Sequence, residues 1–192
     1  MDISNIIEFM ETDKLSVTFS ADGLKYLSLK GNEGEEIIDL KKFNKENENP
    51  IVNLLIRETI NFLETGNHNM ILDLKGYTAF QQMVFDAVGK INVGDICTYK
   101  ELAEKLGKPK AARVVGSASA KNPVSYFIPT HRVLPQKGIG ECRSGAGYLR
   151  EKLLVHEGHD INKLRYGGKK PKPNNLAEME DKDYENSRII RK

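Results

Sequence analysis

The chain has 192 residues, of which 39% are hydrophobic, and its 29 lysines and arginines nearly balance its 27 aspartates and glutamates. Two cysteines are too few for a disulfide scaffold, and no run approaches the roughly 20 apolar residues of a membrane span. Because the first residues also lack the basic-then-apolar order of a secretory signal, we expect a soluble protein of a reducing, intracellular compartment.

Charge is distributed unevenly along the chain. Residues 1–75 carry 8 basic and 14 acidic side chains, residues 76–160 carry 12 and 8, and residues 161–192 carry 9 and 5. A protein that meets a polyanion with one face is expected to show such an asymmetry. Chance segregation of solvated surface charge explains it equally well, so other features must decide.

The first 75 residues have the pattern of a small α/β domain. Alternating side chains over 15–31 predict two strands around the turn at 20–23. Apolar residues at helical spacing predict a helix over 51–64, and the run at 70–74 predicts a further strand. Nothing in this segment indicates a chemical role.

The pattern of residues 76–160 is mainly helical. A helix is predicted over 78–90. Thr98 and Glu101 then have the spacing of a capping box and begin a second helix, which ends at a Gly-Lys-Pro-Lys turn. Small residues dominate a third helix over 110–121, whose backbone can therefore approach another surface closely. The last two helices form a helix-turn-helix pattern, although most such pairs in proteins serve packing alone.

Residues 161–192 combine few apolar residues with Gly-Gly, two Lys-Pro steps and dense charge. This composition predicts a disordered basic tail. Its lysines can add phosphate contacts, but a solvated tail is the simpler interpretation.

One segment resembles a known active-site signature. Asn122-Pro123-Val124, followed by Ile128-Pro129-Thr130-His131-Arg132-Val133, is similar to the motif of the alkylguanine–DNA alkyltransferases, also called methylated-DNA–protein-cysteine methyltransferases. The resemblance extends over 76–160. Members of that family turn an alkylated guanine out of the duplex and move its alkyl group onto a cysteine of the protein, without a cofactor or metal. The resemblance implies an α/β N-terminal domain followed by a mostly α, winged helix-turn-helix domain.

The sequence departs from that family at the acceptor cysteine, whose position is occupied by Thr130. A thiol ionises readily and gives a soft thiolate, whereas a threonine hydroxyl is far less acidic and is crowded by its β-branch. Alkyl transfer to Thr130 is therefore not expected. Alkyltransferase-like proteins also lack the cysteine, hold the alkylated guanine without repairing it and recruit nucleotide excision repair. That branch usually has Trp or Ala at this position and a single domain.

The residues that support the cysteine in the family have counterparts here. By resemblance, His131 is the base that acts through water, Glu157 orients His131, and Asn122 braces the recognition helix against the active-site strand. The alternatives are a hydrogen-bonded core histidine, a surface carboxylate near a helix end and a turn-forming asparagine before proline.

The resemblance also implies a DNA-binding surface on the helix-turn-helix. Arg113 matches the arginine that fills the gap left by the extruded base, and Tyr99 matches the aromatic residue that helps to rotate the target phosphate. Ala112, Gly116 and Ser117 keep the second helix narrow enough for the minor groove. A half-buried tyrosine at a helix start is an equally good interpretation of Tyr99.

The remaining site residues are expected to line the pocket for the flipped base. These are Pro129, Val133, Arg143, Ser144 and Gly145. Arg143 replaces an aromatic residue that usually stacks on the guanine, and it could stack through its guanidinium plane or reach a phosphate. Cys142 beside it could be a relocated acceptor, but a lid loop would not hold the sulfur in line with the alkyl carbon. Cys97 is expected in the core, and no metal site is expected.

These observations predict three parts: a small α/β domain over 1–75, a DNA-binding and active-site domain over 76–160, and a tail over 161–192. The predicted function is a monomeric DNA repair protein that binds duplex DNA in the minor groove and flips alkylated guanine without transferring the alkyl group. Its expected partners are alkylated double-stranded DNA and nucleotide excision repair proteins, in the cytoplasm (nucleoid) or nucleus. The alternatives are an active alkyltransferase with another acceptor or an inactivating substitution, and an interaction module that no longer binds DNA.

Overall fold

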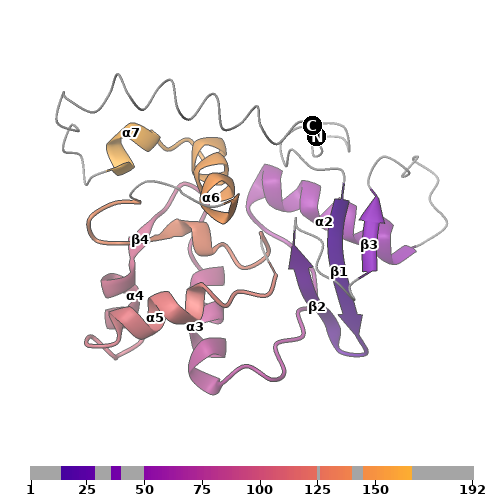
Figure 1. The fold of residues 1–192 in the computed structure, drawn as a ribbon, viewed down its shortest axis with the longest axis horizontal. Coiled ribbons are helices and arrows are strands. Elements are labelled where there is room, and N and C mark those ends of the chain that lie inside the picture. The colour runs from indigo at the N-terminus through magenta and orange to yellow at the C-terminus, as the bar shows by residue number, and fades with distance from the viewer. Residues whose placement is uncertain (1–13, 29–35, 40–49, 125, 140–144, 166–192) are drawn as a thin grey trace.

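The structure is a computed structural model that describes residues 14–28, 36–39, 50–124, 126–139 and 145–165 (Figure 1). A small sheet with one long helix occupies one side, and a group of shorter helices occupies the other. These elements confirm the expected α/β class. None of the helices in the described ranges has the length and apolar character needed to span a membrane.

Three strands form the N-terminal sheet in the order β2-β1-β3, with both pairs antiparallel. They are β1 (Lys14–Ser20), β2 (Gly23–Ser28) and β3 (Glu36–Asp39). The tight turn before Gly23 confirms the predicted hairpin. Gly23 has a φ of 141°, and a Cβ there would lie 2.5 Å from the Ile71 carbonyl oxygen, so only glycine fits.

The strand predicted over 70–74 is wrong. Instead of a regular strand, the structure has a single parallel bridge between Leu24 and Leu72. Two backbone hydrogen bonds flank it, from Leu24 to Ile71 and from Asp73 to Leu24. Met70 is buried in the core, Leu72 and Leu74 pack against it and Ile71 is 72% exposed, so the segment contributes to the core without extending the sheet.

The helix predicted over 51–64 is observed as α2 (Pro50–Thr65). Val52, Leu55 and Phe62 on its buried face belong to the main hydrophobic cluster. The same cluster contains Val17 of the sheet and Val84 of the C-terminal helices. One continuous core thus joins the N-terminal sheet and α2 to the helical part of the chain.

The predicted helices after residue 76 are α3 (Ala79–Gly89), α4 (Tyr99–Lys105) and α5 (Ala112–Ser119). The capping box at the start of α4 is confirmed: Glu101 N donates to Thr98 Oγ1, and the Glu101 carboxylate accepts from Thr98 N at 2.6 Å. Because α4 and α5 pack directly against each other, they form the expected helix-turn-helix.

Two further strands, β4 (Cys97–Thr98) and β5 (Val133–Leu134), form a short parallel pair. The 3-10 turn η2 (Thr130–Arg132) leads into β5, and α6 (Gly145–His156) follows. The range expected to be a disordered tail begins with a helix, α7 (Ile161–Leu164), whose first turn is capped by the Asp160 side chain. The tail prediction is therefore wrong for these four residues.

The N-terminal sheet holds the segment that leads to the resemblance motif. Leu27 N on the edge strand β2 donates to Pro123 O at 2.9 Å, and Leu27 forms a parallel bridge with Val124. His68 supports the same segment further along, since its Nε2 lies 2.8 Å from Phe127 O. The motif is therefore held between the N-terminal elements and the C-terminal helices.

A substitution at Gly66, which follows α2, tests this junction. Gly66 has a φ of 73°, and a Cβ there would overlap Val93 and lie 3.1 Å from Arg132 Nη2. We expect Gly66→Ala to lower the free energy of unfolding by about 1–3 kcal/mol, through left-handed backbone strain and overpacking. Gly89→Ala is the matched control, since Gly89 is helical and has open space around its α carbon. Urea unfolding should show Gly89→Ala neutral or slightly stabilising; equal effects of both variants would contradict the packing described.

Candidate functional site

The residues around Thr130 form the centre of the candidate site. In the run 126–134, every residue is buried except Thr130, which is partly exposed. Its backbone is held on both sides: Thr130 N donates to Ile128 O at 2.7 Å, and Val133 N donates to Thr130 O. The turn therefore presents one side chain from an otherwise buried segment.

Asn122 fixes the orientation of the Thr130 hydroxyl. Asn122 Oδ1 accepts from Val124 N at 3.0 Å, so its Nδ2 must face the opposite side, where it donates to Ile128 O at 2.8 Å and to Thr130 Oγ1 at 3.2 Å. Because Nδ2 has no lone pair, the threonine oxygen is the acceptor in this contact. The structure thus brings Asn122 and Thr130 together.

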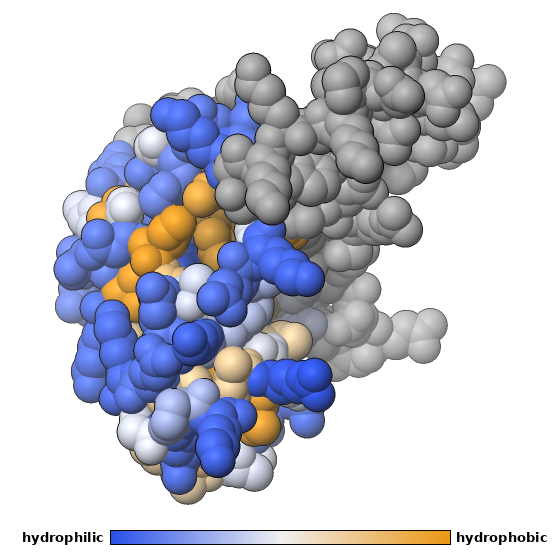
Figure 2. All heavy atoms as spheres, turned by 90° about the vertical axis from the view of Figure 1, so that its left-hand side faces the viewer, coloured by the Kyte–Doolittle hydropathy of each residue, from blue (hydrophilic) through white to orange (hydrophobic). Residues whose placement is uncertain are grey.

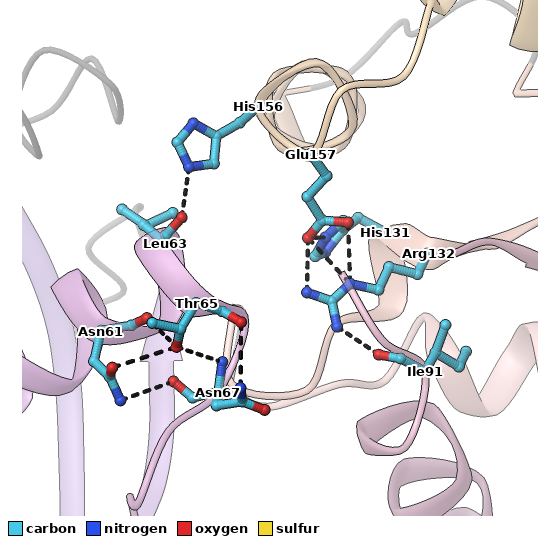
Figure 3. A network of polar contacts seen from close by, with 9 residues as sticks. All are labelled: Asn61, Leu63, Thr65, Asn67, Ile91, His131, Arg132, His156 and Glu157. Atoms are coloured by element: carbon cyan, nitrogen blue, oxygen red, sulfur yellow. Dashed lines mark hydrogen bonds and ion pairs between the residues drawn. The ribbon is translucent and has the colours of Figure 1, made fainter. Parts of the chain in front are cut away.

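The two residues that follow Thr130 in the chain, His131 and Arg132, form a buried network with Glu157 (Figure 3). His131 Nε2 is 2.8 Å from Glu157 Oε1, and the side chains of both residues are about 5% exposed. Arg132 donates to the same carboxylate from Nε and from Nη2, the latter at 2.7 Å. His131 and Glu157, which the resemblance paired, therefore lie in direct contact.

Electrostatics define the protonation state of this network. Burial acts to raise the pKa of Glu157, but hydrogen bonds from His131 and Arg132 outweigh it and lower the pKa to about 2. Burial lowers the pKa of His131 and outweighs the opposing influence of Glu157. A carboxylate can only accept, so His131 is neutral with its hydrogen on Nε2. No hydrogen bond from the described residues reaches its Nδ1.

No role for Arg132 was predicted from the sequence, although this residue lies in the motif. Its side chain is 1% exposed, its Nη1 donates to Ile91 O at 2.6 Å, and its guanidinium lies 5.5 Å from the centre of the Phe62 ring. A fully buried arginine needs such partners to offset its lost hydration. The only sequence signal was a charged residue between the short apolar runs 126–129 and 133–135.

His68 is a partly buried histidine for which no role was predicted from the sequence. Its Nδ1 accepts from Met70 N at 3.1 Å, so its Nε2 carries the hydrogen and donates to Phe127 O. Burial lowers the pKa of His68, which keeps this arrangement neutral. The ring also lies 4.8 Å from the Phe127 ring, so it supports the motif from the N-terminal side.

The left-hand side of Figure 1, where α4 and α5 lie, faces the viewer in Figure 2, and hydrophilic side chains dominate it. On α5, Arg113 and Ser117 are exposed, whereas Ala112 and Gly116 are partly buried. Tyr99 packs on Gly116, since a Cβ at this glycine would lie 3.8 Å from the tyrosine ring. Tyr99 is thus half-buried at the helix start, while α5 keeps a narrow exposed edge.

The expected pocket residues are only partly described. Pro129 and Val133 are buried beside Thr130, and Gly145 begins α6. Arg143, Ser144 and Cys142 lie outside the described residues. Cys97 is 8% exposed, and burial raises the pKa of its thiol, which makes it a poor nucleophile. Within the described ranges, no group of three or more His, Cys, Asp or Glu residues could hold a metal ion.

Sequence comparison relates the chain to a known protein family. A family model for the DNA-binding domain of 6-O-methylguanine DNA methyltransferase matches residues 79–159. The chain is 38% identical over 147 residues to the methylated-DNA–protein-cysteine methyltransferase of Haemophilus influenzae, which covers 73% of this chain and 79% of that protein. It is 37% identical over 101 residues, or 53% of this chain, to the human protein of the same name. The matched segment spans about half the length of the human and Shigella flexneri proteins, at 48% and 49%.

Solved structures share the fold. The Mycobacterium tuberculosis OGT in complex with DNA aligns with 74% of this chain and 86% of its own, at a TM-score of 0.54 and 25% identity. The O6-methylguanine DNA methyltransferase of Methanococcus jannaschii aligns with 77% of this chain and 89% of its own, at a TM-score of 0.53 and 21% identity. With the relative from Haemophilus influenzae matched over most of its length, the chain belongs to the methylated-DNA–protein-cysteine methyltransferase family.

Proposed function

We propose that this protein binds duplex DNA and holds an O6-alkylated guanine beside Thr130 without taking up its alkyl group. One observation carries the proposal: Asn122 bonds to Thr130 and the next residue, His131, bonds to Glu157, while residue 130 itself offers a hydroxyl. Relatives are named for transfer to a protein cysteine. In this proposal the protein still recognises the alkylated guanine but does not transfer the alkyl group.

The exposed face of α5 supports DNA binding. Arg113 extends from its first turn into solvent, and Lys108, Lys110 and Lys121 are exposed at its two ends. Lysines placed in this way neutralise phosphates, while small residues such as Gly116 let the helix enter a minor groove. In this proposal Arg113 occupies the stack after the base has left it, and residues 76–160 carry both the binding surface and the site.

The chemistry at residue 130 supports retention without transfer. Displacement at an alkyl carbon requires a strong nucleophile, because no oxyanion develops that the protein could stabilise. Neutral His131 is too weak a base to ionise an alcohol to a useful extent. With no transfer, the bound lesion would remain for other proteins, and we propose nucleotide excision repair proteins as the partners of a monomer acting at the chromosome.

The first test is the intact mass of the protein after incubation with a duplex that contains O6-methylguanine. We expect no mass change for the wild type, and the gain of one methyl group for Thr130→Cys, because Asn122 Nδ2 would donate to the new sulfur and stabilise its thiolate. Thr130→Ser is the matched control and should gain nothing. A methylated wild-type protein would overturn the proposal, and peptide mapping would then show whether Cys142 is the acceptor.

The second test removes the exposed arginine of α5. We expect Arg113→Ala to weaken binding to an O6-methylguanine duplex by about 1–3 kcal/mol, roughly five- to a hundredfold in Kd. Arg57→Ala on α2 removes the same charge from an exposed position away from α5 and should change Kd little. Fluorescence anisotropy at fixed salt measures both. Absence of binding by the wild type, or equal affinities of both variants, would favour an interaction module that does not use DNA.

A further inference from the structure

The C-terminal end of α2 lies directly beside the buried network, although no role is assigned to the N-terminal elements (Figure 3). We propose that the turn over 61–67 positions Glu157, through His156 and Arg132, and thereby sets which nitrogen of His131 carries the hydrogen. His156 is in this view a positioning residue that acts through its neighbour. The proposal concerns the internal geometry of the site and is independent of whether the lesion is bound.

The first connection runs through His156. Its Nε2 lies 2.6 Å from Leu63 O, and a carbonyl oxygen can only accept, so Nε2 donates. Leu63 O belongs to the last turn of α2, where helix carbonyls lack partners within the helix. His156 and Glu157 are consecutive at the end of α6, so a bond that holds one side chain also fixes the backbone from which the other extends.

The second connection runs through Arg132. Its guanidinium packs near the Phe62 ring of α2, and it fits so closely against Gly66 that a Cβ there would lie 3.1 Å from Nη2. The same guanidinium holds the Glu157 carboxylate and Ile91 O. The end of α2 thus limits where Arg132 can sit, and Arg132 limits where the carboxylate can sit.

The turn is braced by hydrogen bonds among its own residues, although much of it is exposed. Thr65 Oγ1 donates to Asn61 O at 2.8 Å and accepts from Asn67 N at 3.2 Å. Asn61 Nδ2 donates to Asn67 O at 3.1 Å, and Asn67 Nδ2 donates to Thr65 O. Because these bonds join residues of the same segment, they hold the backbone of the turn in one conformation.

The functional consequence lies at His131. While Glu157 remains in place, its carboxylate selects the tautomer with hydrogen on Nε2 and leaves the Nδ1 lone pair available. Among the described residues, the charged groups that act on the His131 ring are Glu157, the adjacent Arg132 and Arg150 of α6. If the end of α6 moved, His131 would lose its acceptor and populate both tautomers.

The test is the tautomer of His131, measured by long-range ¹H–¹⁵N NMR of the full chain at neutral pH, with the signal assigned through His131→Gln. We expect the Nε2–H form to dominate in the wild type. His156→Ala should at least double the share of the Nδ1–H form, whereas His156→Gln, whose amide can still donate to Leu63 O, should restore the wild-type spectrum. Val155→Ala, at an exposed neighbouring position on α6, is the control and should leave the tautomer unchanged.

A second variant covers the case in which His156→Ala does not fold. Thr65→Val removes the hydroxyl bonds of the exposed turn and should shift the tautomer in the same direction by a smaller amount. A wild-type His131 spectrum in a folded His156→Ala or Thr65→Val protein would overturn the inference, even if unfolding shows a loss of stability. Failure of the wild type to bind alkylated DNA would instead reject the proposed function and leave this inference standing.

Discussion

The buried carboxylate of Glu157 is the constraint on which the rest of the site depends. A charge that is almost completely removed from water is tolerated only when it is paired and hydrogen-bonded. Arg132 neutralises it, and His131 provides a further donor. Because these two partners are adjacent in the chain, their pairing forces the tight η2 turn to lie over the end of α6. As a result, η2 leaves Thr130 partly exposed and buries His131 and Arg132.

This network does not require a thiol, which explains how the fold accommodates Thr130. The described contact of the Thr130 side chain is the hydrogen bond from Asn122, and a hydroxyl accepts it as readily as a sulfur. Apart from that bond, Asn122, Arg132 and Glu157 bond to backbone atoms, to one another or to His131. The reactive group can therefore change while the scaffold that surrounds it persists, which is the physical basis for separating recognition from chemistry.

Local sequence patterns predicted the elements that form through local forces. The capping box of Thr98 and Glu101 and the hairpin turn before Gly23 depend on residues within a few positions of each other. The expected strand over 70–74 failed because an apolar run does not reveal whether backbone partners exist on both sides. The helix at Ile161–Leu164 was missed because a capping aspartate was outweighed by the polar composition that follows it.

The site itself could be anticipated only through the resemblance motif, since its bonds join distant parts of the chain. His131 and Glu157 are 26 positions apart, and His156 and Leu63 are 93 positions apart, so no spacing rule predicts either contact.

Two attachments place the site between the exposed face of α5 and the end of α2. Asn122 follows α5 closely, with its N–H on Ser119 O, and bonds to Thr130, so a short hydrogen-bonded connection links the helix to the site. On the opposite side, the end of α2 contacts Arg132 and His156. In the proposed function the energy of binding would distort the DNA duplex and turn the base toward Thr130.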